Sequence, residues 1–210
     1  MVEIKRIICG NGNCFLIKDN DEAILVDTSR TKYRKQIIDS CKNLNIKLII
    51  LTHGHVDHIQ NAAYLSKELN APIAMHKADY ELSKNNIPEP LSAHTLLGKI
   101  ILALSIKSFE KDEIESIEPT IFLSYGDSLN DFGINATIIG LPGHTKGSIG
   151  IKVGENDFIV GDALMNMFYP TTSLLYGNYE KMKNSADRIS NSGQMTIHFG
   201  HGKSVSNRKW

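Results

Sequence analysis

The beginning of the chain contains short apolar runs that are separated by polar turns. In the first run apolar and polar residues alternate, and the next two are short and nearly continuous. Turns rich in Gly, Asn and Asp follow the first and second runs. This pattern predicts three strands of an antiparallel meander, at Ile4–Cys9, Cys14–Lys18 and Ala23–Val26.

Helical and strand-like patterns then alternate along the chain. Apolar residues with helical spacing predict helices at Thr31–Asn43, Val56–Leu69, Ala78–Lys84 and Tyr179–Ser190. Short aliphatic runs predict further strands at Lys47–Leu51, Ile73–Met75, Ile121–Ser124, Ala136–Leu141, Ile149–Val153, Phe158–Val160 and Met195–Phe199. Because two strand-rich parts each have accompanying helices, we expect one α/β (α+β) domain over residues 1–210. In this domain two mixed sheets would pack face to face with helices on the outside.

The segment between Pro88 and Pro119 differs from this pattern. Leu91–Phe109 is rich in Leu and Ile, and Glu110–Glu118 is acidic, so we expect one or two helices inserted at about 88–119. The apolar residues either pack on the body as ordinary core or form a hydrophobic lid or a homo-oligomer surface. They are Leu96, Leu97, Ile100, Ile101 and Leu104.

Composition excludes several classes of function. The 23 basic residues equal the 23 acidic ones, so the chain lacks the basic excess of a protein that binds nucleic acid. No apolar run approaches the roughly 18 residues of a membrane span. The first residues lack the features of a secretory signal, so we expect a cytoplasmic protein without a membrane partner. The three cysteines, Cys9, Cys14 and Cys41, have no metal-ligand spacing and indicate reduced thiols.

Histidine and aspartate gather where four predicted strands end. Each of these strands is followed by a turn that combines His or Asp with Gly. The turns are His53-Gly54-His55-Val56-Asp57-His58, Leu141-Pro142-Gly143-His144, Gly161-Asp162 and Gly200-His201-Gly202. If these strand ends meet at one edge, five His and two Asp face a common point, which is typical of a catalytic or metal site.

Imidazole and carboxylate groups suit zinc, which takes four donors and keeps one position open for water when it is catalytic. Gly54 permits the tight backbone that lets His53 and His55 point to one side, and Asp57 and His58 in the next helical turn reach a second point. Seven ligands exceed what one zinc ion needs. They suffice for two ions that share one carboxylate.

At these motifs the chain resembles the metallo-β-lactamase superfamily. The His-x-His-x-Asp-His run, the Pro-Gly-His-Thr turn ending at Thr145, the Gly-Asp and the Gly-His-Gly occur in the family's order. The match extends to Asp27, which is similar to the family's early strand-end Asp. The resemblance therefore covers nearly the whole chain, and it implies an αββα sandwich.

The resemblance also implies a division of the ligands between two zinc ions, with iron or manganese as other possible metals. His53, His55 and His144 would bind one ion, Asp57, His58 and His201 the other, and Asp162 would bridge them. By simple counting two zinc ions, two carboxylates and a hydroxide leave the site at about +1. Anionic or polarised carbonyl and phosphoryl substrates are therefore favoured.

Other polar residues have open interpretations. Asp27 either orients a ligand imidazole or caps a strand end. His76 and His198 are more typical of core or supporting histidines than of ligands. His94 and Tyr169 are candidates for contact with substrate, although a solvated loop position is the simpler interpretation of His94.

The expected mechanism is metal-assisted hydrolysis of a small ester, thioester, lactone or phosphodiester by a hydroxide that bridges two zinc ions. Asp57 is a catalytic candidate because it can orient that hydroxide or handle a proton. The insertion at 88–119 is expected to select the substrate. Its apolar residues suit an acyl chain or a hydrophobic leaving group.

Departures from subfamily patterns narrow the choice. His55 stands where flavodiiron-type oxidoreductases have Glu, and Asp162 stands where some antibiotic-hydrolysing enzymes have Cys. Only nine residues follow His201, which argues against the C-terminal glutathione-binding domain of hydroxyacylglutathione hydrolases. Neutral charge and the wrong kind of insertion argue against ribonuclease Z-like enzymes. Homoserine-lactone lactonases have a Tyr shortly after the bridging Asp, near the place where Met165 stands here.

Two alternatives to a dinuclear zinc hydrolase remain: a mononuclear iron enzyme resembling persulfide dioxygenases, and a non-catalytic metal-binding protein.

Overall fold

The computed structural model describes residues 2–85, 91–109 and 115–210. Six strands form the first sheet in the order β1-β2-β3-β4-β5-β6. They are β1 (Glu3–Cys9), β2 (Gly12–Asp19), β3 (Glu22–Val26), β4 (Asn45–Ile50), β5 (Ile73–His76) and β6 (Ile121–Leu123). Strands β1 to β3 pair antiparallel and β3 to β6 pair parallel. The predicted meander is therefore confirmed, and the sheet is mixed.

A second mixed sheet has the order β13-β12-β9-β8-β7. Its strands are β7 (Ala136–Gly140), β8 (Ile149–Val153), β9 (Asp157–Ile159), β12 (Thr196–His198) and β13 (Val205–Ser206). A small antiparallel ribbon, β10 (Leu164–Met165) with β11 (Thr171–Thr172), follows β9. The pattern did not predict β10, β11 and β13, because two-residue strands are too short to have a period.

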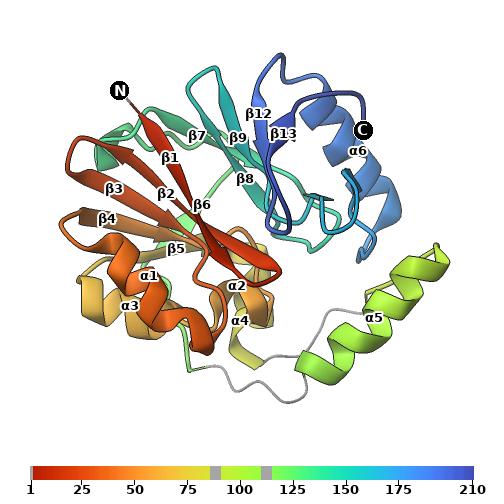
Figure 1. The fold of residues 1–210 in the computed structure, drawn as a ribbon, viewed down its shortest axis with the longest axis horizontal. Coiled ribbons are helices and arrows are strands. Elements are labelled where there is room, and N and C mark those ends of the chain that lie inside the picture. The colour runs from red at the N-terminus through yellow and green to blue at the C-terminus, as the bar shows by residue number, and fades with distance from the viewer. Residues whose placement is uncertain (1, 86–90, 110–114) are drawn as a thin grey trace.

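The described residues form the helices α1 (Arg34–Cys41), α2 (Val56–Ile59), α3 (Ala62–Leu69), α4 (Tyr80–Asn85), α5 (Leu96–Phe109) and α6 (Tyr179–Ser190). Helices α1 and α3 cover the outer face of the first sheet, and α6 covers that of the second (Figure 1). Single 3-10 turns occur at Thr31–Tyr33, Lys77–Asp79 and Asn130–Phe132. Among the described residues, no helix is long and apolar enough to span a membrane.

Three apolar clusters define the four layers. Side chains of β2 alternate between two of them: Leu16 packs with α1 and α3 on the outer face, and Phe15 and Ile17 pack between the sheets. The third cluster joins the second sheet to α6 through Phe158 and Ile189. Each fully buried aliphatic or aromatic side chain contributes roughly 1.5–3 kcal/mol. The expected αββα sandwich is confirmed.

Two expectations about helices need correction. The helix predicted over Val56–Leu69 divides into α2 and α3, because the residues between them bond to another segment. Asn61 Nδ2 donates to the backbone carbonyl oxygens of Thr28 and Arg30, both at 2.8 Å, and Oε1 of the Gln60 side chain accepts from Thr31 N at 3.0 Å. The break therefore joins the start of α3 to the loop that follows β3.

The helix expected within 88–119 is α5, and the parts of this segment at 88–90 and 110–114 lie outside the described residues. In Figure 1, α5 lies at the edge of the molecule, away from both sheets. Leu96, Ile100 and Leu104 are 77%, 51% and 64% exposed. The interpretation as ordinary core is therefore wrong for these three side chains.

Candidate metal centre

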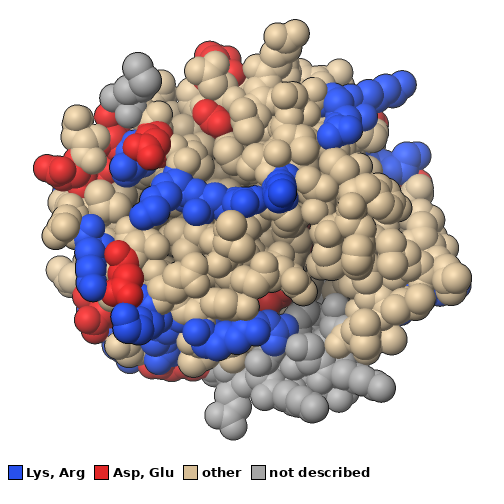
Figure 2. All heavy atoms as spheres, in the orientation of Figure 1, with Lys and Arg blue, Asp and Glu red and all other residues tan. Residues whose placement is uncertain are grey.

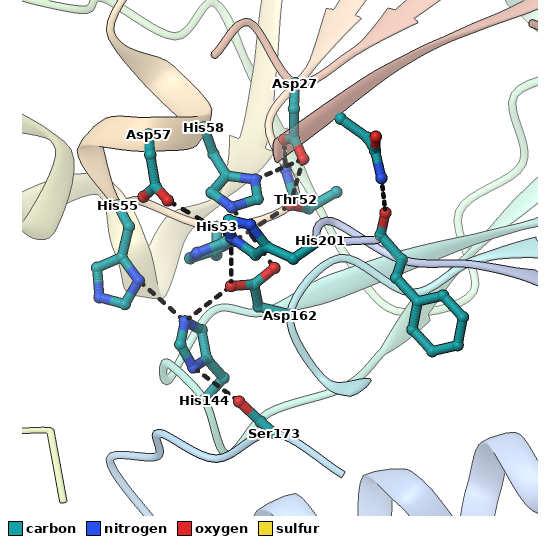
Figure 3. A network of polar contacts seen from close by, with 12 residues as sticks. Asp27, Thr52, His53, His55, Asp57, His58, His144, Asp162, Ser173 and His201 are labelled. Carbon is teal, nitrogen blue, oxygen red and sulfur yellow. Dashed lines mark hydrogen bonds and ion pairs between the residues drawn. The ribbon is translucent and has the colours of Figure 1, made fainter. Parts of the chain in front are cut away.

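The side chains of the predicted ligand residues gather around one point (Figure 3). The segment between β4 and α2 carries His53 and His55, and α2 itself carries Asp57 and His58. The segments that follow β7, β9 and β12 carry His144, Asp162 and His201. The strands thus bring seven side chains together from residues that are far apart in sequence. All the histidines among them are buried.

Their donor atoms form three overlapping groups. In each group one ligand atom per residue lies within 4.8 Å of the others. The groups are His53, His55 and His144; His53, His58 and Asp162; and Asp57, His58 and His201. The first and third groups share no residue, so the geometry provides two separate points of convergence.

Asp162 lies between these two points. Its Oδ1 is 3.5 Å from His58 Nε2, and its Oδ2 is 3.6 Å from His144 Nε2 and 3.3 Å from His201 Nε2. One carboxylate therefore faces donors from both groups. This is the position that a shared ligand requires.

The donor set fits metal ions. His53 Nε2, His58 Nε2 and Asp162 Oδ1 are buried and have no hydrogen-bond partner among the described residues. Such atoms are costly in a folded protein unless a further partner satisfies them. His55 Nδ1 and His144 Nε2 are 3.0 Å apart. A bound cation would accept the lone pairs of these two nitrogen atoms. Imidazole nitrogen and carboxylate oxygen donors suit zinc or iron.

The family comparison identifies this arrangement. The profile of the family described as the metallo-beta-lactamase superfamily matches residues 7–201. The chain belongs to this superfamily. One curated relative is hydroxyacylglutathione hydrolase GloC of Haemophilus influenzae. It is 28% identical to this chain over 188 residues, and the match covers 88% of this chain and 81% of GloC. An uncharacterized protein of Mycobacterium tuberculosis is 26% identical to this chain, and the match covers 92% of this chain and 87% of that protein.

Solved structures of the superfamily share the fold. The BLEG-1 B3 metallo-beta-lactamase aligns with a TM-score of 0.76 and 19% identity, covering 97% of this chain and 94% of its own. The protein TTHA1623, solved in a di-iron-bound form, aligns with a TM-score of 0.72 and 21% identity over 96% and 94% of the two chains. The predicted resemblance is thus confirmed, and the subfamily is left unassigned.

One expectation from the sequence is not tested by these comparisons. The matched region covers 81% of GloC, a protein named as a hydroxyacylglutathione hydrolase. The argument against a C-terminal glutathione-binding domain after His201 stays a prediction.

Hydrogen bonds at the outer side of each ring orient the candidate ligands. Thr52 Oγ1 lies 3.1 Å from His53 Nδ1, and the Leu175 carbonyl oxygen lies 2.8 Å from His144 Nδ1. His201 Nδ1 is 3.0 Å from the carbonyl oxygen of Asn11. A carbonyl oxygen can only accept, so His144 and His201 donate from Nδ1 and direct Nε2 into the centre.

The Asp27 carboxylate bonds both to the segment that follows β4 and to α2. Its Oδ2 is 2.8 Å from His58 Nδ1, and its Oδ1 accepts from the backbone N of Thr52 at 2.8 Å. Thr52 Oγ1 also donates to Asp27 Oδ2 at 2.9 Å. The backbone at Asp27 has a positive φ of 59°, a sparsely populated conformation for a non-glycine residue. Of the two interpretations of Asp27, the geometry favours orientation of a ligand imidazole.

The charges of the cluster shift the pKa values in opposite directions. Burial and the neighbouring His144 lower the pKa of His55 to about 3. Burial alone would also lower the pKa of His58, but the carboxylates of Asp162 and Asp27 outweigh it and raise that pKa to about 9. Burial would raise the pKa of Asp162, but His201 and His58 keep it well below its usual range. The carboxylate is therefore ionised at neutral pH, as a metal ligand must be.

Sequence reasoning missed Asp79, which is fully buried beside the first group. Its Oδ2 accepts from Gly54 N at 2.9 Å and from Thr145 Oγ1 at 2.6 Å, and its Oδ1 accepts from Gly147 N. One carboxylate thus fixes the turn of His53 and His55 against the turn of His144. A Cβ at Gly147 would lie 2.6 Å from Asp79 Oδ1, so the close approach requires glycine there.

The β1–β2 hairpin fixes the last turn. Asn13 Nδ2 donates to the carbonyl oxygens of Phe199 and Gly202 at 2.9 and 2.8 Å. Arg6 also donates to Gly202 O at 3.0 Å. Asn13 N donates to the Gly200 carbonyl oxygen at 2.8 Å. The position of His201 therefore depends on the first two strands.

The remaining polar candidates lie elsewhere. His198 is bonded to Asp157 Oδ1 and Ser204 Oγ, both at 2.8 Å, and His76 stacks on Tyr125 with ring centroids 4.9 Å apart. Neither belongs to the metal-ligand groups of the described residues. His94 packs 5.1 Å from the Tyr179 ring, and Tyr169 is 54% exposed. Neither His94 nor Tyr169 is among the described residues that line the pocket above the cluster.

Proposed function

We propose that this chain is a metal-dependent hydrolase that binds two divalent ions. Zinc is the proposed metal. His53, His55 and His144 would hold one ion, and Asp57, His58 and His201 the other. The observation that carries the proposal is the position of Asp162 between these two sets of donors. The chain would form one domain over residues 1–210, with the segment at 88–119 inserted in it.

When bound, the ions would supply a water of lowered pKa and positive charge that polarises the scissile group. The protein's own residues contribute position and proton transfer. Asp57 Oδ2 lies 3.5 Å from His201 Nε2, and its side chain is 21% exposed, compared with 7% for Asp162. Asp57 also lines the pocket, so it is the ligand carboxylate best placed to handle a proton at the substrate.

The substrate class would be a small ester or thioester, with lactones and phosphodiesters as further members of the test panel. The name of the relative GloC supports an acylated thiol as the first compound to try. A single buried iron with oxygenase chemistry is the alternative, and the di-iron form of TTHA1623 makes iron worth testing. A non-catalytic metal-binding role is the third hypothesis.

Metal analysis together with turnover tests the proposal. We expect two ions per chain in purified wild-type protein and hydrolysis of at least one member of the panel. Asp162→Asn should lose metal and activity. Asp157→Asn, which makes the same chemical change on β9 beside His198, should retain both. One iron with no zinc would favour the oxygenase, and two ions without hydrolysis of any panel member would contradict the hydrolase.

A further inference from the structure

A pocket of about 490 Å³ lies above the candidate metal centre. Its floor contains His55, Asp57, His144, Asp162 and His201. The volume falls in the range of about 300–1,000 Å³ that is typical of small-molecule sites. Its walls differ in chemistry, and this difference bears on the substrate.

One wall is apolar. Leu91, Ile101 and Leu104 contribute from the segment that leads into α5 and from α5 itself, and Met165, Met167 and Phe168 contribute from the chain after Asp162. Leu104 and Phe168 are each 64% exposed, although both face the pocket. Covering such side chains stabilises a complex by roughly 25 cal/mol per Å² of apolar surface removed from water. In Figure 2 the surface over α5 is almost entirely uncharged.

Another part of the pocket lining carries positive charge. It is formed by Ser29, Arg30, Lys32 and Tyr33 from the loop after β3, with Asn11 beside them. Arg30 and Lys32 are the cationic residues among the described residues that line the pocket. The acidic lining residues, Asp57 and Asp162, are both candidate metal ligands.

The cationic wall is held in a fixed position relative to the metal centre. Thr28 N and Thr28 Oγ1 both donate to the carbonyl oxygen of His58, at 2.7 and 2.9 Å. Asn61 Nδ2 donates to the carbonyl oxygen of Arg30 at 2.8 Å. Lys32 Nζ lies 4.9 Å from the centroid of the Tyr33 ring. The backbone at Arg30 is therefore tied to α2 and α3, the helices that follow the first ligand turn.

From these two walls we propose that the substrate is an amphipathic acyl compound with an aliphatic chain on one side of the scissile bond and a carboxylate on the other. The carboxylate would pair with Arg30 and Lys32, and the chain would lie against Ile101 and Leu104. This inference rests on the proposed hydrolase function. In a thioester of this kind, hydrolysis breaks the acyl carbon–sulfur bond. The hydroxyl of water joins the acyl carbon and the sulfur leaves with a proton, so no redox partner is needed.

The test separates binding from turnover. N-hexanoyl-β-alanine is the amide analogue of the hexanoyl thioester of 3-mercaptopropionate, and its primary amide carries neither a charge nor an ester bond. Calorimetric titration of metal-loaded protein should give a Kd about tenfold lower for the acid than for the primary amide, as expected for a fixed charge pair. The double variant Arg30→Gln/Lys32→Gln should remove this difference. Lys35→Gln/Lys42→Gln, which removes two exposed lysines bonded to Asp39 outside the pocket, should retain it.

A second pair of variants, one inside the pocket and one outside it, tests the apolar wall. Ile101→Ser/Leu104→Ser should raise the Kd of N-hexanoyl-β-alanine by about tenfold and leave the Kd of N-acetyl-β-alanine nearly unchanged. Only the longer acyl chain covers these two residues. Leu96→Ser/Ile100→Ser, on the same helix but not among the lining residues, should have no such effect. Equal affinity for the acid and the primary amide, or a preference for the acid that survives in Arg30→Gln/Lys32→Gln, would overturn the inference. Turnover of the corresponding thioester is a separate readout, and its absence alone would count against the hydrolase and not against the binding mode.

Discussion

Asp79 Oδ2 accepts a hydrogen bond from the hydroxyl of Thr145 at 2.6 Å, although 65 residues separate them. Thr145 directly follows His144, and the same oxygen accepts from Gly54 N between the first two histidines. The residue that positions the first ligand group is therefore neither a ligand nor part of any ligand motif.

Asp79→Ala should uncouple the two turns. Three buried donors would lose their acceptor, and each costs about 1–3 kcal/mol when unsatisfied. We expect a clear fall in the free energy of unfolding, together with preferential loss of one of the two metal ions. Asp79→Asn retains one acceptor oxygen and should give an intermediate result. Equal metal content in wild type and Asp79→Ala at matched folding would refute a positioning role.

Asp27→Asn should weaken metal binding without removing a ligand. The amide cannot stabilise a His58 ring that donates from Nδ1 as well as a carboxylate does, and loss of such a partner typically costs about 10–100-fold in metal affinity. Competition with a chromophoric chelator measures this change. As a control, Asp131→Asn changes an exposed residue far along the chain and should leave the affinity unaltered. An unchanged affinity in Asp27→Asn would indicate simple strand-end capping.

Asp57→Asn tests proton transfer at the substrate. If Asp57 handles a proton, kcat should fall by about 10²–10⁴-fold, the usual contribution of general acid–base catalysis. Metal content must be measured on the same sample, because Asp57 is also a candidate ligand. A variant that keeps both ions and full turnover would remove the catalytic role from Asp57.

Alkaline pH should destabilise the fold through Cys41. Burial raises the pKa of Cys41 from an ordinary value of 9.0 to about 11. Between these values the unfolded chain has released the thiol proton and the folded chain retains it, so stability decreases as pH rises from 9 to 11. The decrease approaches about 2–3 kcal/mol for a shift of this size. Urea unfolding at pH 7.5 and 10.5 should therefore show a smaller pH effect in Cys41→Ala than in wild type, and an equal effect in both would contradict the burial argument.

The sequence predicted most of the sandwich and the ligand turns because these depend on local patterns. Glycine beside His or Asp at a strand end is visible in one dimension, and so are the short apolar runs that form the strands. A nearly continuous run does not show that Phe15 and Leu16 belong to different layers. The separation of α2 from α3 was not predictable, since Asn61 fits a helical pattern and is removed from it by bonds to a distant loop.

Asp79 was missed for a related reason. It lies in a 3-10 turn after β5, and only the packing of that turn against Gly54 and Gly147 gives its carboxylate a role. The sequence left the exposure of α5 open, because an apolar helix has the same sequence whether it faces a core or a pocket. Arg30 and Lys32 belong to no motif in the sequence, and only the fold places them at the pocket that contains the candidate ligands.

The contact of Asn13 with the backbone around His201 has a consequence for biosynthesis. The hairpin that orients the last candidate ligand leaves the ribosome well before His201, because translation runs from Asn13 toward His201. The nascent chain therefore cannot complete the metal centre before the turn of His201 has emerged. Metal capture with full affinity would then be a late event that reports on the closure of the whole fold, and not an early nucleus that guides it.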